Sequence, residues 1–167
     1  MEKVDILRQT DIFFDLSSAQ LEMLASICEE RTVKLGDIVF EENSQGGEMF
    51  IISRGAVEIL VDPSIVGGPG SRKRGASPVT IATLRSGQTF GEIALVDQGL
   101  RTASARCAEA DTQLLAIQRE KFMKLCDTYP EMGYRVMRNI AAELSFKIRG
   151  SDLAIREQLL WRPRSGA

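Results

Sequence analysis

The chain has 167 residues, 44% of them hydrophobic, and a formal net charge of −2, so it can bury one core but cannot bind nucleic acid through bulk charge. It has no histidine, which argues against the usual histidine-based catalytic and metal sites, and its three widely spaced cysteines do not form a disulfide or zinc pattern. No apolar run approaches the roughly 20 residues that cross a bilayer, and the N-terminus has no apolar signal core, so we expect a cytoplasmic protein without a membrane span.

The N-terminal part of the chain predicts two helices. Residues 3–9 predict a short one, and Ser17 followed by Gln20 has the spacing of a capping box that opens a longer one. The apolar positions that then recur at helical spacing are Leu21, Leu24, Ala25 and Cys28. One face of this second helix is therefore expected to be buried.

From Arg31 onward the pattern becomes that of short strands. β-branched and aromatic runs are interrupted by turn residues at intervals of about ten, namely Gly36-Asp37, Gly46-Gly47 and Gly55. Further strands are predicted in VTIATL, TASARC and TQLLAIQ, with a glycine- and proline-rich loop over 62–78 that carries the basic run 72–74. This spacing predicts an antiparallel sandwich or barrel and not a parallel sheet with crossover helices.

The C-terminal part predicts a short helix that Pro130 stops, then a long helix from about Glu131 to Leu160, with Gly150-Ser151 as the place where it bends or ends. Its apolar stripe contains Met132, Val136, Met137, Ile140, Ala141, Leu144 and Ile148. Because this stripe exceeds what one small roll needs, it predicts a homodimer through the long helix.

The expected fold class is α+β and mainly β: an antiparallel β-roll, or jelly roll, flanked by N-terminal helices and a long C-terminal helix. We expect residues 1–130 to form the roll with its N-terminal helices and the short helix after it. Residues 131–161 would form the long lid or dimerisation helix, and residues 162–167 a flexible tail.

The stretch from Gly87 to Ala103 carries the chemistry. Two glycines allow the backbone to turn sharply near Gly91, and Glu92 then opens one turn of helix whose free N–H groups suit an anion. Arg101 has a planar guanidinium that can hold two phosphate oxygens, while a carboxylate such as Glu92 suits a sugar hydroxyl. Taken alone, these residues fit a nucleotide site and a Glu92–Arg101 ion pair that braces a loop equally well.

The same stretch resembles a known family. GEIAL, a short connection and then RTAS are similar to the phosphate-binding cassette of cyclic nucleotide-binding domains, which include the catabolite activator protein and protein kinase A regulatory subunits. The preceding GDIVFEENSQGGEMFIISRGAVEI and FFDLSSAQLEMLA resemble the strands and helix that come before the cassette in this family. The resemblance covers roughly residues 5 to 150.

The resemblance implies roles for individual residues. Glu92 would bind the ribose 2′-hydroxyl and Arg101 the cyclic phosphate. The backbone N–H groups that complete the phosphate cradle would be those around Gly91, Ile93, Ala94 and Ala103.

The base would lie in an apolar pocket lined by Ile59 and Ile81, with Thr102 close to both phosphate and base. We expect cAMP as the ligand. The alternative is cGMP, because a hydroxyl after the arginine occurs with both nucleotides in this family. No other cofactor and no metal is implied.

The resemblance also implies a ligand-operated sensor whose C-terminal helix moves when the nucleotide binds. Only 17 residues follow Gly150, too few for a helix-turn-helix, so we expect a stand-alone member that does not bind DNA directly and acts on an unknown effector protein. The candidates for capping the base are Asn139, Glu143, Phe146 and Lys147. An enzyme is not expected without histidine, and a non-binding interaction domain with a structural Glu–Arg brace is the remaining alternative.

Overall fold

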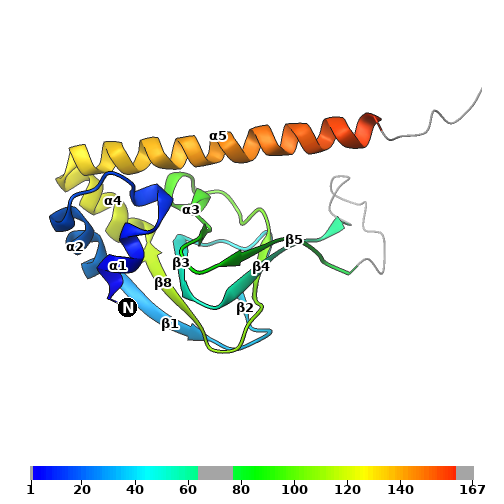
Figure 1. Cartoon of the computed structure of the whole chain (residues 1–167), viewed down its shortest axis with the longest axis horizontal. Helices are drawn as coiled ribbons and strands as arrows, with labels where there is room; N and C mark the ends of the chain where they lie inside the picture. The colour runs from blue at the N-terminus through cyan, green and yellow to red at the C-terminus, as the bar shows by residue number, and fades with distance from the viewer. Residues whose placement is uncertain (1, 64–76, 161–167) are drawn as a thin grey trace, which may run out of the picture.

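The computed structural model describes residues 2–63 and 77–160. Most of the predicted loop over 62–78, including its basic run, lies outside the described residues, as does the predicted tail at 162–167. Figure 1 shows a β-roll with helices packed at one end and one long helix that runs across the top and extends beyond it.

The helical and strand elements follow the predicted order. The helices are α1 (Lys3–Arg8), the 3-10 turn η1 (Asp11–Phe13), α2 (Ser18–Ile27), α3 (Ile93–Val96), α4 (Arg119–Thr128) and α5 (Pro130–Leu160). The strands are β1 (Cys28–Val33), β2 (Ile38–Phe40), β3 (Glu48–Arg54), β4 (Ala56–Val61), β5 (Val79–Arg85), β6 (Thr89–Phe90), β7 (Ser104–Cys107) and β8 (Thr112–Gln118).

Two four-stranded antiparallel sheets form the roll and confirm the predicted fold class. One sheet has the strand order β1-β8-β3-β6 and the other β2-β7-β4-β5. Both orders place strands from distant parts of the sequence side by side, as in the pairing of Phe50 in β3 with Ala116 in β8. The pairing of β3 with β6, which includes Phe50 opposite Phe90, brings the chain directly to the turn that contains Gly91.

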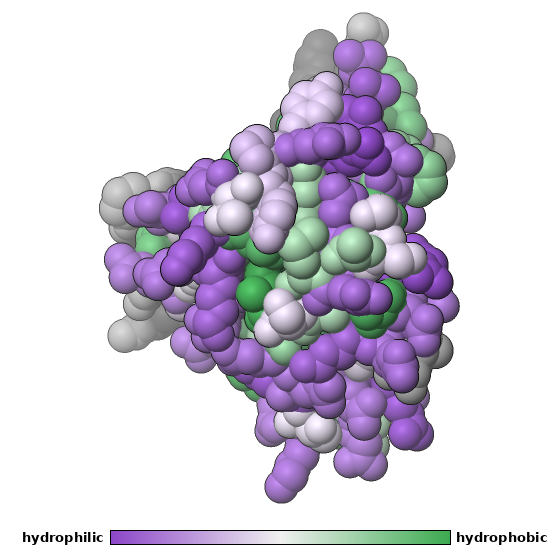
Figure 2. All heavy atoms as spheres, turned by 90° about the vertical axis from the view of Figure 1, so that its left-hand side faces the viewer, coloured by the Kyte–Doolittle hydropathy of each residue, from purple (hydrophilic) through white to green (hydrophobic). Residues whose placement is uncertain are grey.

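The central strands β3 and β8 of the first sheet are buried on both faces, which explains why they are almost continuously apolar. Phe50 and Ile52 face the interior of the roll, where Phe40, Phe50 and Phe90 pack with ring centroids 5.2–6.0 Å apart. The alternate positions Met49 and Ile51 face the helical layer made by α1, α2, α4 and α5. Figure 2 looks at this helical end from outside and shows a mostly hydrophilic surface with a smaller apolar area near its centre.

Local signals in the sequence explain how the helices begin. The Ser17 hydroxyl accepts from the Gln20 N–H, and the Gln20 side chain accepts from the Ser17 N–H, so the predicted capping box is present. Pro130 is the first residue of α5, a position where the missing N–H costs no helical hydrogen bond.

One expectation for the long helix was wrong, and the predicted homodimer stays a prediction. The helix continues through Gly150-Ser151 without ending there. The first half of its apolar stripe belongs to the chain's own core, because Met132, Val136 and Ile140 are fully buried against the helical layer. Those three side chains are therefore not available to a second copy of the chain.

Candidate functional site

A cavity of about 820 Å³ lies between the second sheet, the segment around α3 and the middle of α5. Nine residues were predicted to form a ligand site, and all nine line this cavity: Ile59, Ile81, Gly91, Glu92, Ile93, Ala94, Arg101, Thr102 and Ala103. They come from β4, β5, the turn of α3 and the segment before β7, so only the folded roll brings them together.

Arg101 is the buried cation of the cavity. Its side chain is 7% exposed, and its guanidinium stacks over the Phe40 ring, with Cζ 4.1 Å from the ring centroid. Nη2 donates to the Glu48 carbonyl at 2.7 Å and Nη1 to the Gly91 carbonyl at 3.4 Å. Nε is buried and makes no hydrogen bond within the described residues, so one donor of this group has no protein acceptor.

Burial is also the main influence on the acidity of Arg101. It lowers the pKa of the guanidinium, while the charges of Glu48 and Glu92 act in the opposite direction. The group remains charged at neutral pH, because an arginine begins from so high a pKa. The cavity therefore contains a permanent, desolvated positive charge, which is suited to an anionic ligand.

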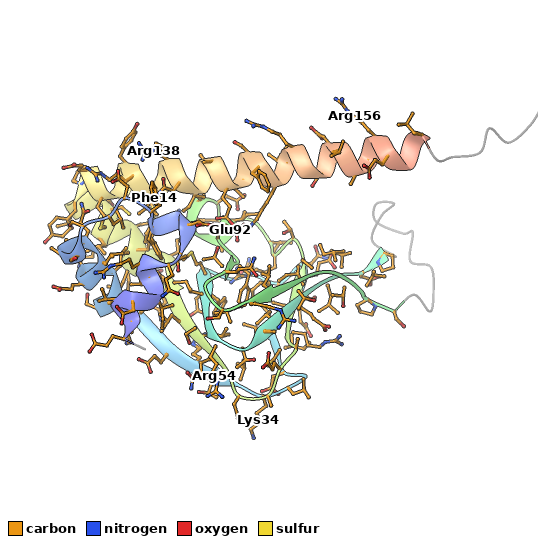
Figure 3. The ribbon with its side chains drawn as sticks, in the orientation of Figure 1. Phe14, Lys34, Arg54, Glu92, Arg138 and Arg156 are labelled. Carbon is orange, nitrogen blue, oxygen red and sulfur yellow. The ribbon has the colours of Figure 1, made fainter. Side chains whose placement is uncertain are left out.

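Glu92 is the buried anion, 5% exposed, at the start of the α3 turn. Its Oε1 accepts a hydrogen bond of 2.6 Å from the ammonium of Lys147 on α5, and this ammonium also lies 3.0 Å from Glu143 Oε1, one helical turn earlier. Figure 3 shows Glu92 directly beneath α5. The carboxylate thus links the α3 turn to the long helix.

Glu92 and Arg101 do not form the loop-bracing ion pair that the sequence left open. Among the described residues, the salt-bridge partner of Glu92 is Lys147, and Arg101 donates to two backbone carbonyls. The two charged groups line the same cavity without neutralising each other directly. This arrangement leaves both of them for a ligand that carries complementary groups.

Burial lowers the pKa of Lys147, but the hydrogen bonds and charges of Glu92 and then Glu143 outweigh it and raise the pKa above its ordinary value. Lys147 is therefore charged throughout the neutral range. With Arg101 it balances the two carboxylates of this part of the cavity.

The opposite side of the cavity is apolar. Ile59 is half-buried against the interior of the roll, whereas Ile81 is 60% exposed and reaches the cavity from the outer strand β5. Val61, Ala82 and Leu84 complete this wall. Thr102 is exposed, and its hydroxyl makes no hydrogen bond within the described residues. A flat apolar group beside a polar one would fit here.

The backbone around α3 has the conformation that its glycine permits. Gly91 has φ +74°, and a Cβ at this position would lie 2.7 Å from Arg101 Nη1 and 3.1 Å from the Glu48 carbonyl oxygen. The Ala94 N–H donates to the Gly91 carbonyl at 3.1 Å, so this predicted cradle donor already has an acceptor inside the turn.

Two of the four candidates for capping the base line the cavity and two do not. Glu143 and Lys147 line the cavity, and Phe146 does not, being 78% exposed. Asn139 is turned toward the N-terminal segment, where its amide donates to the carbonyls of Ile12 at 3.2 Å and Phe14 at 2.9 Å. It anchors α5 to η1.

Sequence reasoning missed the residues that hold Arg101. Gly46 was noted only as a turn residue, yet a Cβ there would lie 2.7 Å from Arg101 Nε and Nη2. Phe40 lies beneath the guanidinium, and Glu48 provides an acceptor through its backbone, which no side-chain pattern reports. The double glycine at 46–47 was the available signal, because two adjacent glycines also mark places where another group approaches the backbone closely.

Comparison with known proteins identifies the family and the fold. The family model described as "Cyclic nucleotide-binding domain" matches residues 30–129. The chain belongs to the cyclic nucleotide-binding domain family. The family is regulatory and generally non-enzymatic, and membership implies a cyclic nucleotide as the ligand of this domain.

The relatives of this cyclic nucleotide-binding domain support the assignment. A cyclic AMP receptor protein of Thermus thermophilus is 28% identical over 149 residues, which are 89% of this chain and 62% of that protein. A cGMP-dependent protein kinase of Drosophila melanogaster, isozyme 2 forms cD5/T2, is 31% identical over 135 residues, 80% of this chain and 14% of the kinase. The chain thus spans less than two thirds of the length of both relatives.

The crystal structure of the Thermus thermophilus catabolite activator protein superimposes on the domain with a TM-score of 0.74 at 28% identity, covering 89% of this chain and 63% of that one. In the described part of the domain, no helix is long and apolar enough to cross a membrane. Nor do three or more acidic, cysteine or histidine side chains gather there as a metal-binding group.

Proposed function

We propose that the domain is a sensor of cAMP whose long helix α5 responds to the occupied cavity. The observation that carries this proposal is the buried Arg101, whose Nε has no acceptor within the described residues, in the same cavity as the buried Glu92 and an apolar wall. A cyclic nucleotide has matching parts: an anion, a hydroxylated sugar and a flat base.

Each part of the ligand has a proposed partner. The cyclic phosphate binds Arg101, with backbone donors around Gly91, Ile93, Ala94 and Ala103. The ribose 2′-hydroxyl donates to Glu92, whose Oε2 makes no hydrogen bond within the described residues.

The base lies against Ile59 and Ile81, with Thr102 beside it. The choice of cAMP is supported by the similarity to the Thermus cyclic AMP receptor, which extends over 89% of the chain, against 80% for the fly cGMP-dependent kinase. The second candidate is cGMP, favoured by the Thr102 hydroxyl, which belongs to a residue that lines the cavity and makes no hydrogen bond within the described residues.

The response is assigned to α5. We assign nucleotide binding to the part of the chain up to about residue 130, and the lid and dimerisation roles to the long helix that follows. Support comes from five residues of α5 that line the cavity, namely Glu143, Lys147, Gly150, Ser151 and Ala154. Because α5 forms one wall of the site, we infer that its packing responds to the bound nucleotide, as in a two-state element that a ligand biases.

Dimerisation through α5 remains part of the proposal, now through the second half of the helix, where only Ile148 belongs to the apolar stripe first expected to form the interface. The second half of the helix exposes a set of large apolar side chains, Phe146, Ile148, Leu153, Ile155 and Leu160. In Figure 1 this half runs above β4 and β5, and its end passes the last described strand, which leaves its outer face open to a second copy of the helix. An unknown effector protein and a cytoplasmic location belong to the same proposal.

Titration calorimetry with cAMP and cGMP tests the function. Saturable heat with either nucleotide is expected, with tighter binding of cAMP. The absence of heat for both would overturn the sensor and favour an interaction domain that binds no nucleotide. Release of the linear nucleotide monophosphate during the titration would instead indicate an enzyme.

A further inference from the structure

Lys147 is the one α5 side chain that hydrogen-bonds to the α3 turn among the described residues. Its ammonium contacts Glu92 Oε1 at 2.6 Å and Glu143 Oε1 at 3.0 Å, and it lines the cavity. Two carboxylates therefore hold one ammonium at the wall of the nucleotide site. An ammonium has three N–H donors, and these two contacts use two of them.

One carboxylate oxygen of Glu92 can accept a further hydrogen bond. Oε1 is occupied by Lys147, whereas Oε2 makes no hydrogen bond within the described residues. A hydroxyl that donates to this carboxylate comes to lie near the ammonium that the same carboxylate binds. Because a hydroxyl is both a donor and an acceptor, its own oxygen then needs a donor.

We propose that Lys147 is a specificity-determining residue for the ribose: its ammonium donates a hydrogen bond to the 2′-hydroxyl oxygen of the bound nucleotide, while Glu92 accepts a hydrogen bond from the same hydroxyl. This rests on the proposed function, and it adds a specificity-determining residue on α5. The sugar is thereby recognised from both sides, by a buried acceptor on the roll and by a cation on the helix. A cyclic ribonucleotide then holds α5 in place, and the 2′-deoxy analogue does not.

The surroundings keep the ammonium in position without a ligand. Glu143 precedes Lys147 by four residues, the spacing at which side chains on one helix face meet. Earlier in α5, Asn139 and Arg135 hydrogen-bond to the η1 segment and to Asp15, which hold the helix at its N-terminal half. The ribose would thus meet a preplaced donor and not a free lysine chain.

The test compares the affinities of cAMP and 2′-deoxy-cAMP by calorimetry in the wild-type chain and in Lys147→Met. Methionine keeps an unbranched stem and removes the donor. The ratio of the two affinities is the measured quantity, because loss of the positive charge weakens both nucleotides. We expect the preference for cAMP to fall on the order of 10- to 100-fold, the effect of one hydrogen bond to a charged group.

Three matched variants isolate the cause. Arg156→Met removes a cation that points away from the body on the same helix, as Figure 3 shows, and should leave the ratio unchanged. Lys147→Arg keeps a donor and should retain most of the preference. The double variant Glu143→Gln/Lys147→Met conserves net charge and should still lose the preference, because the donor is absent.

The outcomes separate this proposal from the proposed function. If the wild-type chain binds no cyclic nucleotide, the function itself fails. If the wild-type chain binds cAMP and Lys147→Met keeps the full preference over 2′-deoxy-cAMP, the role of Lys147 in ribose specificity is overturned and the sensor stands. Lys147 is half-exposed, so the variant is expected to fold, and Lys147→Ala gives the same comparison should Met disturb the helix.

Discussion

The ammonium of Lys147 and the carboxylate of Glu92 lie 2.6 Å apart although 55 positions separate them in the chain. This contact joins the second half of α5 to the turn that holds the cavity's only fully buried carboxylate among the described residues. Among the described residues of α5 after Asn139, Lys147 is the one whose side chain hydrogen-bonds to the roll, and the other side-chain hydrogen bonds stay within the helix. The contact between Lys147 and Glu92 is therefore the polar contact that holds the second half of α5 to the roll.

Loss of the Lys147–Glu92 contact should destabilise only the second half of α5. In Lys147→Met without nucleotide, we expect amide exchange to rise several-fold from residue 147 onward, while the segment around Val136 and Ile140, buried in the core, keeps its protection. Hydrogen exchange with mass spectrometry measures this. Arg156→Met should resemble the wild-type chain, and equal loosening of both halves would contradict a local tie.

Arg101→Lys should weaken nucleotide binding by roughly 1–3 kcal/mol, because lysine keeps the charge but lacks the planar fork and the unpaired Nε. The Glu48 and Gly91 carbonyls also lose a well-placed donor. Calorimetric titration with cAMP gives the change. Equal affinity in the variant and the parent would mean that Arg101 is not the phosphate ligand.

Gly46→Ala should reduce affinity without touching the ligand directly. The new Cβ would lie 2.7 Å from Arg101 Nε and Nη2, so the guanidinium must shift from its position over Phe40. We expect a loss on the order of tenfold, since displacement by about an ångström misaligns a bidentate contact. Gly47→Ala is the matched control, with its Cβ in ordinary contact at 3.7 Å from Arg119 Cβ. Equal losses in both variants would argue against an effect through Arg101.

Leu153→Glu should convert a dimer to a monomer. Leu153 is 61% exposed on the projecting half of α5, and a charge in an apolar helix interface opposes association. Light scattering at tens of micromolar, with and without cAMP, measures the mass. A wild-type monomer under both conditions would contradict the proposed dimer, as would a Leu153→Glu chain that still dimerises through α5.

Burial raises the pKa of the Cys28 thiol from 9.0 to about 12, the nearby Lys3 charge opposing it. The unfolded chain therefore loses this proton first as the pH rises above 9, so the free energy of unfolding falls from there toward pH 12. The expected slope is on the order of 1 kcal/mol per pH unit.

Urea unfolding between pH 7.5 and 10.5, in the wild-type chain and in Cys28→Ala, measures this slope. The stability of the wild-type chain relative to the variant should decline above pH 9. Ile27→Val, which removes no ionisable group, should keep a constant offset from the wild-type chain. A constant offset for Cys28→Ala as well would show that the buried thiol does not titrate differently in the two states.

The sequence by itself determined the local features and the family. The Ser17–Gln20 capping box, the glycine-punctuated strands and the GEIAL–RTAS cassette are each contained in one short continuous stretch of the chain. Such spacing dictates turns, caps and strand periodicity through backbone sterics and nearby hydrogen bonds, whatever the rest of the chain does.

Only the tertiary structure decided the partners of the charged residues and the use of the long helix. Whether Glu92 pairs with Arg101 or with Lys147 depends on where α5 docks, and whether Val136 and Ile140 face a second copy or the chain's own core depends on the same docking. Arg101 finds its acceptors on Glu48 and Gly91 because strand pairing places those carbonyls beside it. These contacts, which span between ten and about fifty positions, follow from how the sheets and helices pack, because side-chain type alone leaves several partners equally suitable.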